Sequence, residues 1–295
     1  SVSTDPEHKA DMERACDFLV DQLTNLGTDH VEIFPTPMHP ILFAEKHSSK
    51  PDAPTLLIYG HYDVQPVAPL DEWKSPPFDP TLEGDYLIAR GASDMKGQVM
   101  AVLSAIDSIV KTTELPLNLK FLFEGEEEIG SPSLETFIAS HRDLLACDLV
   151  LNPDAGMVGP DSPTIVYGLR GLVYFEVRID GPKADLHSGL FGGVVANPAI
   201  VLSEIIASLH APDGSVAIPG FYDQVLPLTP EEKARMAANP TRESDLLAIT
   251  GAPALYGEAG YTPLERIGAR PTLDVNGLYS GFIGEGSKTI IPAYA

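Results

Sequence analysis

The sequence predicts an α/β protein with a largely parallel β-sheet, helices on both faces of it, and a smaller α+β domain that follows. Short apolar runs typical of buried strands occur at residues 55–59, 86–89, 117–123 and 148–151. Stretches with the apolar spacing of helices lie between them, and strands that alternate with helices usually form a parallel sheet covered on both faces. Strict alternation of apolar and polar residues over 173–180 predicts that the second domain opens with a half-buried strand.

Three helices are expected in the first domain. Residues 4–7, Thr-Asp-Pro-Glu, have the capping residue, early proline and acid of a helix N-terminus. Apolar residues then recur at helical spacing over 12–26, and Gly27 ends the pattern. Similar patterns predict helices over 100–110 and 133–145.

The character of the sequence changes at residues 168–172, where we place a domain boundary. The alternating strand is followed by a glycine-rich turn and by a helix with apolar residues over 200–209. A long segment bearing Pro and Gly runs to about residue 272, and residues 288–292 are expected to form another strand. The chain then stops at Ala295 without a closing element, so we expect a fragment of a longer protein.

Composition and charge exclude several classes of protein. With 44% hydrophobic and 21% charged residues, the chain is typical of a soluble globular protein, and its apolar runs are too short to cross a membrane. The 42 acidic and 19 basic residues give a net charge of −23, which disfavours nucleic acid as a partner. The two cysteines, Cys16 and Cys147, form no spacing motif, so we expect reduced core residues and a cytoplasmic location.

Four polar clusters follow the four predicted strands of the first domain. A crevice forms at the carboxyl ends of the strands in an open α/β sheet, so we expect the clusters to converge there. One imidazole with several carboxylates suits zinc or a similar divalent ion. The clusters are Gly-His-Tyr-Asp at 60–63, Ser-Asp-Met-Lys-Gly at 93–97, Glu-Gly-Glu-Glu-Glu at 124–128 and Asn-Pro-Asp at 152–154.

Each signal alone has a plainer interpretation. A lone His61 is usually a satisfied core histidine, but its place after a strand favours a metal ligand whose second ring N–H is accepted by Asp63. The acidic run 126–128 is usually a solvated loop. In a crevice, however, one of its carboxylates could bind a metal while a neighbour removes a proton from the metal's water. Asp94 is a candidate for a carboxylate that bridges two ions.

In combination, these motifs resemble the co-catalytic zinc metallopeptidases, the family of cytosolic non-specific dipeptidase, carnosinase, aminoacylase, acetylornithine deacetylase and succinyl-diaminopimelate desuccinylase. The resemblance covers residues 55–295, and Tyr62 with 64–66 and 186–193 looks closer to the dipeptidase and carnosinase branch. It implies a zinc-aminopeptidase-like mixed sheet with an inserted two-layer α+β lid. Residues 1–168 would then be the N-terminal part of the catalytic metal-binding domain. Residues 169–295 would be an incomplete lid that forms a homodimer.

The resemblance also implies a ligand set for two divalent ions, expected to be zinc, with manganese as an alternative. His61 and Asp154 would hold one ion, and Glu128 would hold the other. Asp94 would bridge the two ions.

Further roles follow from the same resemblance. Glu127 would be the general base and later the proton donor to the leaving amine, and Asp63 would orient His61. His187 in the lid would reach across the dimer to stabilise the oxyanion in the neighbouring site. Thr289 would contact the substrate.

We therefore expect a metallopeptidase of the dipeptidase or carboxypeptidase type, in which a hydroxide held between two metal ions attacks the peptide bond. One alternative is an N-acyl amino acid deacylase that uses the same site, and another is a non-catalytic dimerisation or binding protein. The family also has a last histidine ligand in a returning C-terminal segment. His141, His187 and His210 do not match it, so we expect this chain alone to be inactive.

Overall fold

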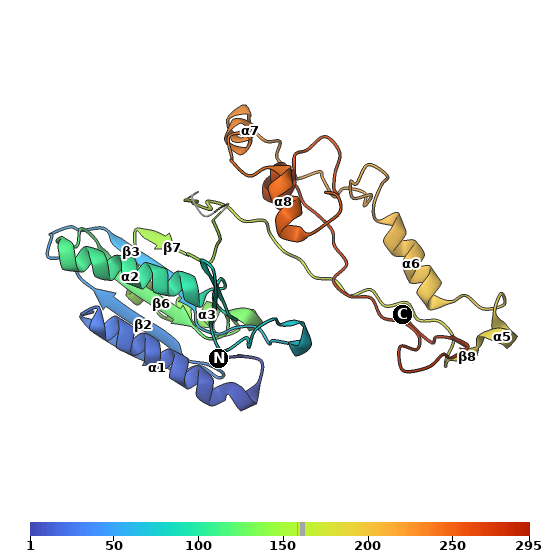
Figure 1. The fold of residues 1–295 in the computed structure, drawn as a ribbon, viewed down its shortest axis with the longest axis horizontal. Helices are drawn as coiled ribbons and strands as arrows, with labels where there is room; N and C mark the ends of the chain where they lie inside the picture. The colour runs from blue at the N-terminus through green and yellow to red at the C-terminus, as the bar shows by residue number, and fades with distance from the viewer. Residues whose placement is uncertain (158, 160–162) are drawn as a thin grey trace. The chain divides into compact units, whose positions relative to one another are not determined.

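The chain divides into two compact units, Ser1–Gly156 and Met157–Ala295, in the computed structural model, which describes residues 1–157, 159 and 163–295 (Figure 1). The predicted boundary at 168–172 falls inside the second unit. The catalytic and lid roles expected of the two domains stay predictions. No helix in the described ranges combines the length and the apolar character needed to cross a membrane.

A five-stranded mixed sheet forms the centre of the first unit, in the order β1-β2-β6-β3-β7. The pairs β1–β2 and β2–β6 are antiparallel, whereas β3 is parallel to both β6 and β7. The predicted strands at 55–59, 117–123 and 148–151 are therefore confirmed, and they form the parallel part of the sheet. The five strands are β1 (His30–Phe34), β2 (Ile41–Lys46), β3 (Thr55–His61), β6 (Asn118–Glu124) and β7 (Leu149–Leu151).

Helices cover both faces of this sheet, as the sequence predicts. A short η1 (Pro6–His8) leads into α1 (Lys9–Asn25), which packs with α2 (Lys96–Thr112) on one face. The two helices lie along the strands in Figure 1. Helices α3 (Leu134–Ser140) and α4 (Arg142–Leu145) cover the other face.

The buried side chains of the sheet divide between its faces with the period of two that a strand imposes. Ile58 belongs to the core beneath α1 and α2, and its neighbour Leu57 belongs to the core beneath α3 and α4. On β6, Phe121 and Phe123 face the first core and Leu122 faces the second. Because β3 runs parallel to both β6 and β7, the carboxyl ends of these three strands lie at the same edge of the sheet.

The strand predicted at 86–89 is confirmed as β5 (Tyr86–Ile88), but it does not join the main sheet. Among the described strands it pairs only with β4 (Thr81–Glu83), in an antiparallel hairpin. Leu82, Tyr86 and Leu87 are exposed, so this hairpin has no buried face that would fix it in the sheet. The expectation that all four polar clusters follow strands of one sheet is therefore wrong for the cluster at 93–97.

The second unit contains five helices and one short antiparallel pair among its described residues. The pair joins β8 (Leu186–His187) to β9 (Ile290–Ile291), which confirms the strand predicted at 288–292, and α6 confirms the helix predicted near 200–209. The helices are α5 (Ser188–Phe191), α6 (Pro198–Ser208), α7 (Pro230–Ala237), α8 (Glu243–Thr250) and α9 (Pro263–Ala269).

The strand predicted over 173–180 is not formed in the structure. Within the part of the chain that the structure describes, only its last residues have backbone partners: Ile179 pairs with Ala295, and Asp180 forms an isolated bridge with Tyr294. A strand needs a neighbour for its N–H and C=O groups. The alternating pattern predicts a half-buried strand, but Val173, Phe175 and Val177 are exposed and have no backbone partner among the described residues.

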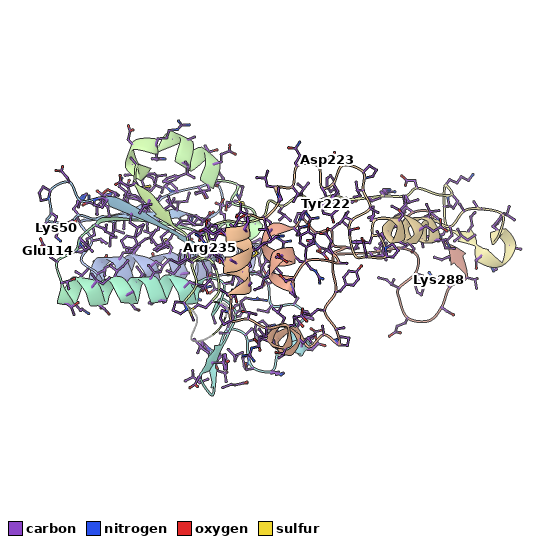
Figure 2. The ribbon with its side chains drawn as sticks, turned by 90° about the horizontal axis from the view of Figure 1, so that it is seen from above. Lys50, Glu114, Tyr222, Asp223, Arg235 and Lys288 are labelled. Atoms are coloured by element: carbon purple, nitrogen blue, oxygen red, sulfur yellow. The ribbon has the colours of Figure 1, made fainter. Side chains whose placement is uncertain are left out.

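A partly buried ion pair joins Glu258, which precedes α9, to Arg270 at the C-terminal end of that helix. The Arg270 guanidinium donates two hydrogen bonds to the Glu258 carboxylate, at 2.8 and 2.6 Å. It also lies over the rings of Tyr222, labelled in Figure 2, and Tyr261, at 4.5 and 4.3 Å from the ring centroids. Arginine suits this position because its planar cation can stack on aromatic rings and pair with a carboxylate at the same time.

Candidate metal centre

His61 is the central residue of the candidate site. It ends β3, is fully buried, and its backbone N–H donates to Met95 Sδ at 3.2 Å. Its Nδ1 lies 3.1 Å from the carbonyl oxygen and 3.2 Å from Oδ1 of the buried Asp63. A proton held at Nδ1 by either oxygen leaves Nε2 with a free lone pair, the form of histidine that binds metals.

Three carboxylates surround the Nε2 atom of His61. Asp94 Oδ1 lies 3.1 Å from it, Asp154 Oδ2 lies 3.6 Å away, and Glu127 Oε2 lies 3.9 Å away. Asp94 lies in the turn before α2, whereas Asp154 follows β7 and Glu127 begins the short helix η3 (Glu127–Ile129) that follows β6. The carboxyl ends of β3, β6 and β7 therefore meet the turn before α2 at this point.

The structure brings together three of the four predicted metal ligands. One ligand atom from each of His61, Asp94 and Asp154 lies within 4.8 Å of the other two. One imidazole and two carboxylates are a donor set that zinc and manganese both accept. The residues present therefore fit a divalent ion.

The three consecutive glutamates of the acidic run have three different environments. Glu126 is only 1% exposed. Its carboxylate accepts hydrogen bonds from the backbone N–H groups of His39 and Ser133 and from the Thr36 hydroxyl. The expectation that the carboxylates of the whole run crowd into the crevice is wrong for Glu126. In a 3₁₀ turn, successive side chains point about 120° apart, so neighbours in sequence separate in space.

Glu128, the fourth predicted ligand, lies outside the group of three. Its Oε1 accepts a hydrogen bond from the backbone N–H of Gln65 (3.1 Å), and its Oε2 accepts one from Gln65 Nε2 (2.8 Å). The backbone N–H of Glu128 donates to Asp63 Oδ2 at 3.1 Å. Sequence reasoning missed Gln65, since a neutral amide is not a usual zinc ligand. The available signal was its place in the loop that carries His61 and Asp63.

The charges of the site favour a cation. Burial by itself would lower the pKa of His61, but Asp63, through its hydrogen bond and its charge, together with Glu127 and Asp154, raises that pKa to about 9. Burial raises the pKa of Glu127, opposed by His61 and reinforced by Asp154 and Glu128. The pKa of Asp154 is also raised, first by burial and then by Asp94, against the effect of His61. A bound cation would relieve this crowding of carboxylates.

His187 and Thr289 lie together in the second unit because β8 pairs with β9. The Gly189 N–H donates to His187 Nδ1 at 3.0 Å, which places the proton of a neutral ring on Nε2, 3.3 Å from Thr289 Oγ1. Both side chains are exposed. Lys288, labelled in Figure 2, directly precedes Thr289, and its ammonium lies 4.4 Å from the Phe282 ring centroid.

Known proteins resemble this chain over almost its whole length. The Cys-Gly metallodipeptidase dug1 of Schizosaccharomyces pombe is 36% identical over 307 residues, covering 99% of this chain and 64% of that protein. The Beta-Ala-His dipeptidase of Homo sapiens is 32% identical over 305 residues, covering 99% of this chain and 60% of that protein. The chain thus spans less than two thirds of the length of these relatives.

Solved structures show the same fold. The M20 family metallo-carboxypeptidase Sso-CP2 from Sulfolobus solfataricus matches with a TM-score of 0.81 at 39% identity, over 96% of this chain and 64% of that one. The di-peptidase Dug1p from Saccharomyces cerevisiae matches with a TM-score of 0.82 at 32% identity, over 99% and 64%. The predicted α/β class and the metallopeptidase resemblance are both confirmed. A family model described as peptidase family M20/M25/M40 matches residues 57–272, and the chain belongs to this family.

Proposed function

We propose that the protein containing this chain hydrolyses dipeptides in a metal-dependent reaction. The observation that carries the proposal is the convergence of His61, Asp94 and Asp154, with Glu127 beside them. The relatives named above, a Cys-Gly metallodipeptidase and a Beta-Ala-His dipeptidase, support dipeptides as the substrate class. They favour this reaction over the removal of N-acyl groups from amino acids.

Two divalent ions, zinc or alternatively manganese, are the proposed cofactors. His61 and Asp154 would hold one ion and Glu128 would hold the other, with Asp94 as the ligand that the two ions would share. When bound, the ions supply Lewis acidity at the carbonyl of the scissile bond. Asp63 keeps the His61 ring oriented, since both its carboxylate and its carbonyl oxygen lie within 3.2 Å of Nδ1.

Glu127 is the proposed acid and base. It takes a proton from the attacking water and returns it to the leaving amine. Its raised pKa supports this role, because an acid/base group works best when its pKa approaches the operating pH. Its carboxylate also lies at the edge of the ligand group, 3.9 Å from His61 Nε2, where it can reach a water held there.

Residues 169–295 are proposed to form a lid through which two copies dimerise. In that arrangement His187 donates from Nε2 to the oxyanion in the partner's site, and Thr289 contacts the substrate. The hydrogen bond from Gly189 to His187 Nδ1 supports this role, because it favours the ring form with its proton on Nε2.

Substrate profiling of the metal-loaded protein tests the proposal. We expect turnover of Cys-Gly or β-Ala-His that is lost after chelation and restored by zinc or manganese. N-acetyl amino acids should be turned over far more slowly. Preferential turnover of N-acetyl amino acids would replace the dipeptidase by a deacylase, and the absence of any turnover with both ions bound would favour a binding protein.

A further inference from the structure

Gln65 contacts Glu128 at three points, two on its carboxylate and one on its backbone. Its backbone N–H and its amide each donate to one oxygen of the Glu128 carboxylate, and the amide also lies 3.1 Å from the Glu128 carbonyl oxygen. Each carboxylate oxygen keeps lone-pair capacity for a further partner, because an ionised carboxylate can accept about four hydrogen bonds or metal contacts. Gln65 therefore orients the carboxylate and leaves it able to bind a metal ion.

The loop that carries Gln65 is itself fixed. The Arg90 guanidinium donates to the Pro66 carbonyl oxygen at 2.9 Å and lies 5.2 Å from the Trp73 ring centroid. The Trp73 indole N–H in turn donates to the Val67 carbonyl oxygen at 2.9 Å. Two successive carbonyl groups after Gln65 are thus held by side chains from other segments, which limits the positions that the amide can reach.

Asp63 binds the backbone of Glu128, the residue that Gln65 contacts. One oxygen of its carboxylate accepts the Glu128 backbone N–H, and the other lies next to His61 Nδ1. The backbone of Glu128 is therefore held by the residue that orients His61, and its side chain is held by Gln65. These contacts connect a ligand of the first proposed metal position to the ligand of the second.

We propose that Gln65 is a positioning residue that sets the Glu128 carboxylate for the second metal ion. The inference rests on the proposed function, in which Glu128 is a ligand. A carboxylate that binds a metal is commonly held by an outer hydrogen-bond partner, whose loss costs roughly 10–100-fold in metal affinity or activity. A neutral amide suits the position, because an acid there would repel Glu128 and an alanine would keep only the backbone hydrogen bond.

Metal titration of Gln65→Ala and Gln65→Glu tests the proposal. Cobalt(II) serves as the probe, with bound ions counted by elemental analysis and the two sites resolved by visible absorption. We expect the first equivalent to bind as in the unmodified protein, and the second to bind roughly 10–100-fold more weakly. Gln65 is exposed, so the melting temperature of the metal-free variants should not change.

The matched control is Gln22→Ala, because Gln22 lies on α1 and makes no side-chain hydrogen bond within the described residues. The second test is a double-mutant cycle with Glu128→Ala. A residue that acts through Glu128 should have no further effect on metal binding once Glu128 is gone.

Unchanged binding of two ions by Gln65→Ala would overturn the inference and leave the proposed function intact. A lower melting temperature of the metal-free variant, together with equally weaker binding of both metal ions, would overturn the inference by showing that Gln65 supports the fold as a whole. A wild-type protein that binds both ions but hydrolyses no dipeptide would overturn the proposed function and leave the Gln65 inference standing. Additive effects of Gln65→Ala and Glu128→Ala would overturn the inference by showing that Gln65 acts on another ligand.

Discussion

The chemistry of the site depends on which of three adjacent glutamate carboxylates faces His61. Glu126 is buried and hydrogen-bonded, Glu127 faces the imidazole, and Glu128 faces Gln65. The sequence predicts an acidic run after a strand, but the direction of each side chain depends on the 3₁₀ turn that follows β6. The sequence alone therefore located the acidic residues, but it could not show that the Glu126 carboxylate accepts hydrogen bonds from the surrounding protein and does not face the metal site.

Glu127 and Glu128 are expected to give opposite phenotypes. Glu127→Gln should leave the metal content nearly intact and lower kcat by roughly 10²–10⁴-fold, the usual contribution of a positioned acid/base. Glu128→Gln should instead lower metal occupancy, because an amide is a weaker ligand than a carboxylate. Elemental analysis and steady-state kinetics on both variants check this. Exchanged phenotypes would show that the two roles are assigned one residue out of register.

Glu126 is expected to matter for stability rather than for chemistry. Glu126→Gln turns one acceptor oxygen into an NH₂ group that must face the N–H of His39 or Ser133. Leaving such a buried donor unsatisfied should cost about 1–3 kcal/mol in the free energy of unfolding. Urea unfolding of the metal-free protein measures this free energy, and Glu135→Gln on the exposed side of α3 is the control. A drop in kcat without a loss of stability would contradict this assignment.

At the scale of elements, the site depends on how a loop meets the start of α2. The segment 91–95 carries Asp94, and Gly97 in the first turn of α2 lies directly against it. A Cβ atom at Gly97 would lie 2.0 Å from the Ala92 carbonyl oxygen, far closer than any real contact. Only glycine therefore lets the loop that presents Asp94 approach the helix so closely.

Gly97→Ala is expected to displace the Asp94 loop. Because the clash is with backbone, the loop or the helix must shift, and overpacking of this kind costs about 1–3 kcal/mol. We expect a lower melting temperature and weaker binding of both metal ions, because both would share Asp94 as a ligand. Gly171→Ala is the matched control, since nothing lies within 4 Å of the Cβ atom it would add. Wild-type metal affinity in Gly97→Ala would show that Asp94 does not depend on this contact.

The elements that the sequence predicted well are those whose burial pattern is local. The alternation of Leu57 and Ile58 in β3 follows from side-chain period alone, and so does the buried stripe of α1. The pairing of strands is not local, so the sequence could not show that Tyr86–Ile88 pairs only with its neighbouring strand. For the same reason it could not show that most of segment 173–180 has no backbone partner among the described residues.

At the scale of the whole molecule, a net charge of −23 raises the local concentration of cations, but it does not select a site. Selectivity for one site comes from the first unit, where the buried imidazole of His61 is surrounded by carboxylates from the loop after β7, from η3 and from the turn before α2. Protons and metal ions compete for these groups, since the pKa values of His61, Glu127 and Asp154 are all raised. Metal binding should therefore weaken as the pH falls.

Metal binding is expected to stabilise the whole protein. A ligand that binds only the folded state at 100 times its Kd adds about 2.7 kcal/mol. Zinc should therefore raise the melting temperature of the metal-free protein, and chelation should lower it while abolishing dipeptide hydrolysis. Asp94→Ala should remove most of this shift without unfolding the protein, because Asp94 is a ligand in the proposed site and its side chain is 63% exposed. Calorimetry at rising zinc and manganese concentrations gives the melting temperatures of the wild-type protein and of Asp94→Ala. An equal shift in Asp94→Ala would place the bound ion elsewhere, and undiminished hydrolysis by metal-free protein would refute a metal-dependent reaction.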